Sequence, residues 1–256
     1  MPGGGSLAGK GITVKGYHPL LSFGRESAAT YDQHPRGDES ETVALLRDLA
    51  KGRRTLELAI GTGRIALPLA EAGVPVEGID LSPEMVEMLR RKPGGQSIPV
   101  TIGDFAHVPV EGEFGLIYLV YNTIYNLLTQ EEQVTCFANV AKHLSADGVF
   151  LVEAFTPGWL FRIRDHQYVD AELIEVDEVR LDVARHDPVK QWLEESHLVM
   201  RAEGVSLFPI VCRYIWPAEM DLMARMAGLR CVDRWGGWRQ EPFTADSKRH
   251  VSVYSR

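Results

Sequence analysis

The chain has 256 residues, and its 45% hydrophobic content suffices for one large α/β domain or for one domain with a subdomain. Its formal net charge of −8, without any cluster of Lys and Arg, argues against nucleic acid as a partner. Three widely spaced cysteines match neither a zinc site nor a disulfide framework and no apolar run could span a membrane, so we expect a soluble, cytoplasmic protein.

The first 38 residues combine a flexible tail with a segment that has no core of its own. Residues 1–6 are rich in glycine, whereas residues 7–38 carry the aromatic side chains Tyr17, His18, Phe23 and Tyr31. Aromatic residues in so short a segment must pack on another part of the protein. The segment is therefore either a lid over an active site or a plain strap over the main domain.

A helix, a strand and a glycine-rich turn follow in quick succession. Apolar residues at helical spacing predict a helix over residues 39–51, which Gly52 ends. The apolar run 55–60 predicts a buried strand, and residues 64–72 predict the next helix. Between them lie Gly61 and Gly63, which allow positive φ and a close approach of the backbone to a ligand at a helix N-terminus.

Acidic residues stand at the ends of the next two predicted strands. Residues 76–79 form an apolar strand that ends at Asp80, and Ser82 and Pro83 then give the start of a helix that carries Met85. A third apolar run, residues 100–105, contains Asp104. Because the carboxyl ends of neighbouring parallel strands meet at one edge of a sheet, we expect these acids to lie near one ligand.

The fourth predicted strand ends in a polar and aromatic cluster. Residues 115–120 are the strand, and Tyr121, Asn122, Tyr125 and Asn126 follow it. A capping box at residues 129–132 begins the next helix, and residues 148–155 form the fifth strand. We expect the cluster to face the reacting centre at the carboxyl edge of the sheet.

The pattern changes after residue 155. Residues 173–183, 191–200 and 205–215 alternate like strands and are separated by turns, which predicts an antiparallel insert over about residues 168–215. A helix over residues 217–227 and strands over 229–234 and 250–254 complete the chain. The predicted domains are therefore a tail and lid at 1–38 and one α/β domain at 39–256 that contains the insert.

The glycine turn by itself allows two cofactors. Residues 61–66 satisfy the dinucleotide fingerprint G-x-G-x-x-A, and Asp80 lies close to the expected distance for a carboxylate that binds a ribose. However, Glu57 lies inside the strand that leads to the turn, where a pyrophosphate gains nothing from a negative charge. Together, Glu57, Asp80 and Asp104 suit a ligand with an amine, a ribose and an adenine but no phosphate.

This arrangement resembles the class I S-adenosylmethionine (SAM)-dependent methyltransferases, in particular their small-molecule, natural-product branch. Their acid-x-Gly/Ala-x-Gly-x-Gly motif is matched by Glu57, Ala59, Gly61 and Gly63, and the resemblance covers roughly residues 31–155. It implies a Rossmann-like fold with a mostly parallel seven-stranded sheet and helices on both faces. The cofactor residues that it implies are Tyr31, Arg36, Glu57, Ala59, Gly61, Gly63, Asp80, Leu81, Met85, Gly103, Asp104, Phe105 and Leu119.

The expected activity is methyl transfer from SAM, with release of S-adenosylhomocysteine, to a nitrogen, oxygen or carbon atom of a small acceptor, for which a heteroaromatic metabolite is one candidate. His18, Tyr121 and Tyr125 are the candidate catalytic residues, because each offers a proton-transferring group near the expected site. We expect a monomer or a homodimer. The candidate residues for the acceptor pocket are Tyr17, His18, Tyr121, Asn122, Tyr125 and Trp159.

Metal dependence is not expected, and two other functions remain open. Metal-assisted catechol methyltransferases place acidic ligands after the fourth strand, where this chain has Tyr121 and Asn122. An NAD(P)-dependent oxidoreductase is kept open by the glycine fingerprint, although it has no obvious use for Glu57 and Asp104. A non-catalytic SAM-binding protein is the third possibility, against which the intact glycine turn and the polar cluster after the fourth strand weigh.

Overall fold

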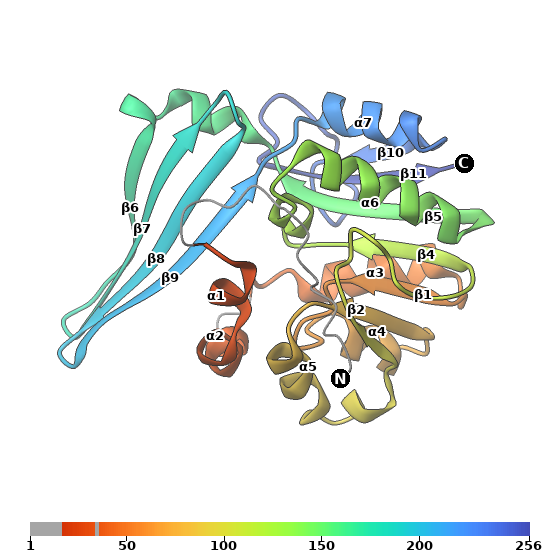
Figure 1. Ribbon diagram of the computed structural model, residues 1–256, viewed down its shortest axis with the longest axis horizontal. Coiled ribbons are helices and arrows are strands. Elements are labelled where there is room, and N and C mark those ends of the chain that lie inside the picture. Colours follow the sequence, from red (N-terminus) through yellow and green to blue (C-terminus); the bar gives the residue numbers. More distant parts are fainter. Residues whose placement is uncertain (1–16, 34–35) are drawn as a thin grey trace, which may run out of the picture.

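The computed structural model describes residues 17–33 and 36–256, and its centre is a seven-stranded sheet (Figure 1). The expected tail and the beginning of the expected lid lie outside the described residues. The strand order is β10-β11-β5-β4-β1-β2-β3, in which β3, β2, β1, β4 and β5 are parallel, β11 is antiparallel to β5 and β10 is antiparallel to β11. The strands are β1 (Thr55–Leu58), β2 (Val76–Asp80), β3 (Val100–Ile102), β4 (Phe114–Leu119), β5 (Leu144–Phe155), β10 (Arg230–Trp235) and β11 (Arg249–Ser255).

Helices cover both faces of this sheet, so its central strands are apolar on both sides. Successive residues of β4 alternate between two cores: Ile117 packs with α6 and α7, whereas Tyr118 packs with α3 and α4. Every residue of β4 is buried. The helices are α3 (Glu39–Ala50), α4 (Ala66–Glu71), α5 (Pro83–Arg90), α6 (Gln130–His143) and α7 (Pro217–Met226).

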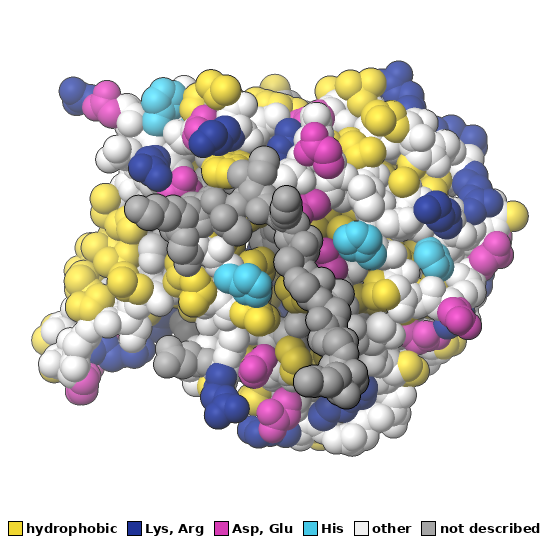
Figure 2. All heavy atoms as spheres, in the orientation of Figure 1, with side chains coloured by type: hydrophobic (Ala, Val, Ile, Leu, Met, Phe, Trp, Pro, Cys, Tyr) yellow, Lys and Arg dark blue, Asp and Glu magenta, His cyan; other side chains and the backbone are white. Residues whose placement is uncertain are grey.

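A second sheet of four antiparallel strands is inserted between β5 and α7 and lies at the left of Figure 1. Hydrophobic side chains gather over this side of the molecule in Figure 2, and Val169, Val205 and Leu207 are among the exposed ones. The predicted insert is confirmed as a fold feature. Its strands are β6 (Gln167–Ile174), β7 (Glu178–Asp187), β8 (Trp192–Arg201) and β9 (Gly204–Arg213).

One predicted strand of the insert was wrong. The strand expected at residues 173–183 spans a turn, because β6 ends at Ile174 and the Glu175 N–H donates to the Glu178 carbonyl at 2.9 Å. Residues 175–177 contain neither Gly nor Pro, so Asp177 was the only turn-forming residue to mark this turn in the sequence. The other two predicted turns of the insert lie between β7 and β8 and between β8 and β9.

The N-terminal segment links the two sheets. It forms α1 (Pro19–Phe23), α2 (Arg25–Thr30) and the short 3-10 helix η1 (Tyr31–Gln33). The Ser22 hydroxyl donates to the Pro209 carbonyl of β9 at 2.5 Å, and the Ser82 hydroxyl donates to the Phe23 carbonyl at 2.6 Å. This segment thus contacts the four-stranded sheet at one point and the turn after β2 at another.

Candidate functional site

The turn after β1 is shaped by three residues with positive φ. Ala59, Gly61 and Gly63 have φ values of 58°, 56° and 76°, so only Ala59 carries a side chain in this strained region. A Cβ on Gly63 would lie 2.2 Å from Leu89 Cδ1, whereas a Cβ on Gly61 would meet only the Met85 methyl at 3.4 Å. Gly63 is therefore needed for packing on α5, and Gly61 is needed for the turn itself.

Asp80 holds this turn from the end of β2. Its Oδ2 accepts the Gly61 N–H at 2.7 Å, and its Oδ1 accepts the Ser82 N–H at 2.8 Å. The side chain is almost buried, and burial raises the pKa of Asp80, although the backbone hydrogen bonds oppose this shift. Each oxygen keeps a further lone pair, so the carboxylate can also accept hydrogen bonds from two adjacent hydroxyl groups.

Glu57 lies deeper than its position in the motif suggested. It is 3% exposed, and its Oε2 accepts the Tyr118 hydroxyl at 2.8 Å. Burial raises the pKa of Glu57 to about 8, and the nearby Asp80 carboxylate adds to the shift. Burial therefore favours the protonated form of this acid, whose side-chain partner among the described residues is the Tyr118 hydroxyl.

Two arginines and two tyrosines form an aromatic corner beside the turn, and the carboxylates of Glu39 and Asp38 also act on Tyr121 there. The Arg36 guanidinium lies 4.3 Å from the centre of the Tyr121 ring, and that of Arg64 lies 4.6 Å from the Tyr31 ring. Among the described residues, the buried Tyr121 hydroxyl has no hydrogen-bond partner. An unpartnered hydroxyl beside two guanidinium groups fits an anionic group of a ligand, such as an α-carboxylate.

A buried acid fixes the backbone at the end of β4. The Glu153 Oε2 accepts the Tyr121 N–H at 2.6 Å, and the Asn122 Oδ1 accepts the Phe155 N–H at 2.6 Å. Tyr121 and Asn122 have φ values of 59° and 61°, which is a strained conformation for two successive residues with side chains. Glu153 and Arg64 were not among the predicted site residues, although Glu153 is an acid inside an apolar strand, the same signal that singled out Glu57.

Apolar groups are exposed on the β2–β3 side of the same edge. Leu81 is 43% exposed and Ile102 is 51% exposed, whereas Met85 and Phe105 are buried and belong to the core. Asp104 is half-exposed and accepts the Ala106 N–H at 2.8 Å. Leu119 is fully buried, and a side chain on Gly103 would collide with Pro109. The exposed apolar surface that could hold a flat ring thus comes from Leu81 and Ile102.

The predicted acceptor residues do not all come together. The structure does not place Tyr125 in an acceptor pocket, where we expected it. Tyr125 is fully buried, and its hydroxyl donates to the carbonyl oxygens of Phe155 (2.7 Å) and Ile215 (3.2 Å), so it is a core residue. His18 is exposed and caps α1, because its Nδ1 accepts the Leu20 N–H at 3.2 Å. The Trp159 ring is 40% exposed and makes an edge contact with Tyr168 at 5.4 Å.

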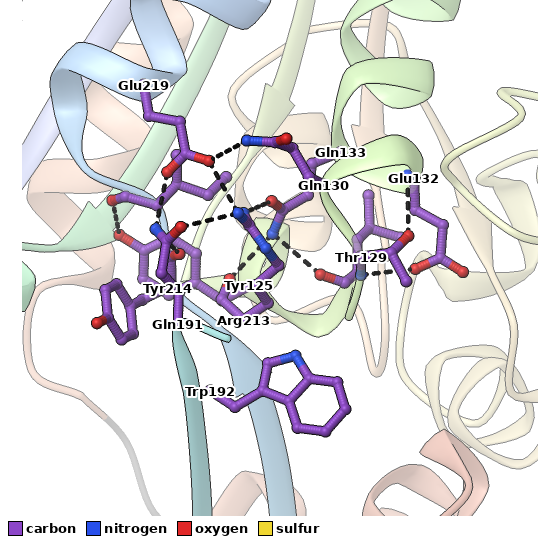
Figure 3. Close-up of polar contacts among 12 residues, drawn as sticks. Tyr125, Thr129, Gln130, Glu132, Gln133, Gln191, Trp192, Arg213, Tyr214 and Glu219 are labelled. Carbon is purple, nitrogen blue, oxygen red and sulfur yellow. Dashed lines mark hydrogen bonds and ion pairs between the residues drawn. The ribbon is translucent and has the colours of Figure 1, made fainter. Parts of the chain in front are cut away.

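A buried polar network joins the four-stranded sheet to the main domain (Figure 3). Arg213 of β9 donates to Gln133 Oε1 of α6 at 2.5 Å and to Gln191 Oε1 at 2.9 Å, and it pairs with Glu219 of α7 at 2.9 Å. Gln133 in turn donates to the Arg213 carbonyl at 2.9 Å. This network sets the orientation of the second sheet relative to the edge of the main sheet at which β1, β2 and β4 end, which is called the cofactor edge below. No motif in the sequence indicated this network.

The comparisons with known proteins agree with this geometry. Residues 55–148 match a family model described as a methyltransferase domain. The CcbJ methyltransferase of Streptomyces caelestis is 35% identical, with a TM-score of 0.86 over 91% of this chain and 97% of that chain. The cypemycin N-terminal methyltransferase of a Streptomyces species is 28% identical over 80% of this chain and 84% of its own length.

A further relative is named for its action on an amino sugar. The dTDP-3-amino-3,6-dideoxy-alpha-D-glucopyranose N,N-dimethyltransferase of Streptomyces fradiae is 28% identical over 56% of this chain and 60% of its own length.

Proposed function

Because the chain belongs to the class I SAM-dependent methyltransferases, we propose that its acceptor atom is the nitrogen of an amine on a small natural product. The protein transfers a methyl group from SAM to a small-molecule acceptor. The NAD(P)-dependent oxidoreductase and the non-catalytic SAM-binding protein find no support in these relatives.

The cofactor edge suits the three parts of SAM. Arg36, Arg64 and the unpartnered Tyr121 hydroxyl would hold the carboxylate, and Asp80 would accept the ribose hydroxyls. The exposed side chains of Leu81 and Ile102 would lie against the adenine. When bound, SAM supplies a methyl group that is already activated by its sulfonium, so the chain's own residues have only to align the acceptor and keep water away.

The observation that carries the proposal for nitrogen is the lack of a ready proton acceptor at the end of β4, within the part of the chain that the structure describes. Burial raises the pKa of Tyr121 far above neutrality, and the Asn122 amide is no base. The Glu153 carboxylate is buried and bound to the Tyr121 N–H. A hydroxyl acceptor needs a base, whereas a neutral amine attacks through its own lone pair. Two of the relatives are named for methylation at amino groups.

Matched pairs of acceptors test this proposal. The full chain is incubated with SAM that carries a labelled methyl group and with compounds that differ only in an amine or a hydroxyl, such as an amino sugar and its parent sugar, or benzylamine and benzyl alcohol. We expect label on nitrogen and none on the oxygen partner. Label on oxygen or carbon at a comparable rate would contradict the assignment of nitrogen while leaving methyl transfer intact.

A further inference from the structure

A cavity of about 780 Å³ lies between α1 and the four-stranded sheet. Leu21, Val169, Val183 and Val211 give it apolar walls, and Tyr168 and Glu195 provide polar groups that line it. This volume is ample for a small metabolite, and a mostly apolar cavity with a few polar groups is the usual form of a small-molecule site. None of the cofactor groups described above lines this cavity.

Glu195 is the carboxylate in this cavity that lacks a cationic partner. Its neighbour Glu194 is neutralised by Arg185 at 2.6 Å. Glu195 instead accepts a hydrogen bond from the Tyr168 hydroxyl, and no Lys or Arg among the described residues pairs with it. A half-buried carboxylate without a counter-ion is costly, and a cationic ligand would remove this cost.

The other titratable groups of the same sheet add to the negative potential around Glu195. Glu172, Asp182 and His197 each place one side-chain oxygen or nitrogen within 4.8 Å of the others, and His197 is bonded to Asp182. Burial raises the pKa of Glu195, the Asp182 and Glu172 carboxylates raise it further, and the Tyr168 hydrogen bond and His197 oppose the shift. The surroundings therefore favour a positively charged guest over a neutral or anionic one.

Aromatic rings connect this cavity with the cofactor edge. Tyr168 makes an edge contact with Trp159 at 5.4 Å, and Trp159 lies 6.2 Å from Phe155, the last residue of β5. The Phe155 N–H in turn is bonded to Asn122 at the end of β4. From the opposite wall, α1 reaches the turn after Asp80 through the bond between Phe23 and Ser82. Aromatic faces next to a carboxylate are a favourable environment for ammonium groups.

We infer that this cavity is the acceptor site and that Glu195 binds the acceptor's ammonium group, with the apolar part of the acceptor on the valines. The inference rests on the proposed function, because it takes the acceptor to be an amine. It assigns the substrate class as an amine with a compact apolar body. Glu195 is a binding residue in this assignment, because it pairs with the ammonium form that the amine has in solution. The amine then gives one proton to water in the open cavity, and the neutral amine attacks the methyl group through its lone pair.

Choline tests the site without any methyl transfer, because its nitrogen carries no lone pair. Its binding to the full chain, treated with chelator so that no metal ion competes at His197, is followed by NMR titration against the neutral isostere 3,3-dimethylbutan-1-ol. We expect choline to bind more tightly than the isostere, and Glu195→Gln to weaken choline binding by about tenfold, the effect of one charge-assisted contact. The matched control Glu194→Gln, which removes a carboxylate already paired with Arg185, should change the affinity by less than about threefold.

A second variant separates charge from folding. Tyr168→Phe removes the hydrogen bond to Glu195 but keeps the carboxylate, so it should bind choline at least as well as the unchanged chain. The inference would be overturned by equal affinity for choline and its isostere, or by unchanged choline affinity in Glu195→Gln. If choline behaves as expected but no amine is methylated, the cation site stands and the proposed function fails. If amines are methylated but Glu195→Gln leaves the affinity for choline unchanged, the proposed function stands and the assignment of this site is wrong.

Discussion

The cofactor edge and the four-stranded sheet hold their polar side chains in different ways. At the cofactor edge, Asp80 and Glu153 accept hydrogen bonds from backbone N–H groups. In the four-stranded sheet, Glu195 accepts from Tyr168 and Glu194 from Arg185, so these bonds run between side chains of different strands. Substitutions at the first region should therefore disturb the backbone, whereas substitutions at the second should mainly change what is bound.

The two regions also differ in burial. Glu57 is 3% exposed beneath the glycine turn, whereas Glu195 lines an open cavity. A charge in the first position must be neutralised by a proton or by a ligand, whereas water screens part of a charge in the second. The Arg213 network connects the two regions.

The largest expected effect is on the pH dependence of stability, through Glu57. The pKa of Glu57 is about 8 in the folded protein, against a usual value of 4.5. Below pH 4.5 this acid is protonated in both the folded and the unfolded chain, whereas between pH 4.5 and 8 it is ionised only in the unfolded chain. Stability should therefore fall from pH 4.5 to 8 by up to about 5 kcal/mol, at 1.36 kcal/mol per pH unit. Glu57→Gln should remove this contribution and make the fall between pH 4.5 and 8 smaller, as denaturant unfolding at pH 4.5, 6 and 8 can measure.

The matched variant for this first test is Glu195→Gln, which should change the pH dependence less because water reaches the cavity. An equal effect of the two substitutions would contradict the difference in burial between the two regions.

The next effect concerns the junction between the sheets. Arg213→Met removes a buried guanidinium that pairs with Glu219 and donates to Gln133, so we expect a loss of about 3–5 kcal/mol in the free energy of unfolding. The control is Arg185→Met, whose guanidinium is 66% exposed and pairs with Glu194, and which should cost about 0–1 kcal/mol. Denaturant unfolding compares the two variants. Equal losses in the free energy of unfolding would contradict a special contribution of the Arg213 network to stability.

The smallest of these effects is on cofactor affinity. Asp80→Ala should weaken the binding of SAM and S-adenosylhomocysteine by about 1.5–3 kcal/mol, the value of a charge-assisted hydrogen bond. Asp104→Ala, at a half-exposed position, should weaken it less. Calorimetric titration of both ligands measures these values. Unchanged affinity in Asp80→Ala would remove Asp80 from the cofactor site.

The sequence by itself determined the order of the main-domain elements and the position of the cofactor edge. Strand, glycine turn and helix are contiguous between residues 55 and 72, and Asp80 follows the next strand directly, so local spacing was enough to place them at one edge of a parallel sheet. The apolar periods of α6 and β5 and the change to alternation after residue 155 were likewise local signals, and the structure confirms them.

Only the tertiary structure decided which polar residues meet. The sequence suggested Tyr125 as a pocket residue because it follows a strand. However, η3 (Thr123–Asn126) directs its side chain into the core, where its hydroxyl donates to two carbonyl oxygens that are distant in the sequence. The contact between Tyr168 and Glu195 joins residues 27 positions apart, and the bond between Arg213 and Gln133 joins residues 80 positions apart. Both depend on strand register and helix packing, and a shift of one residue in strand register would turn Tyr168, Glu195 or Arg213 to the opposite face of the sheet.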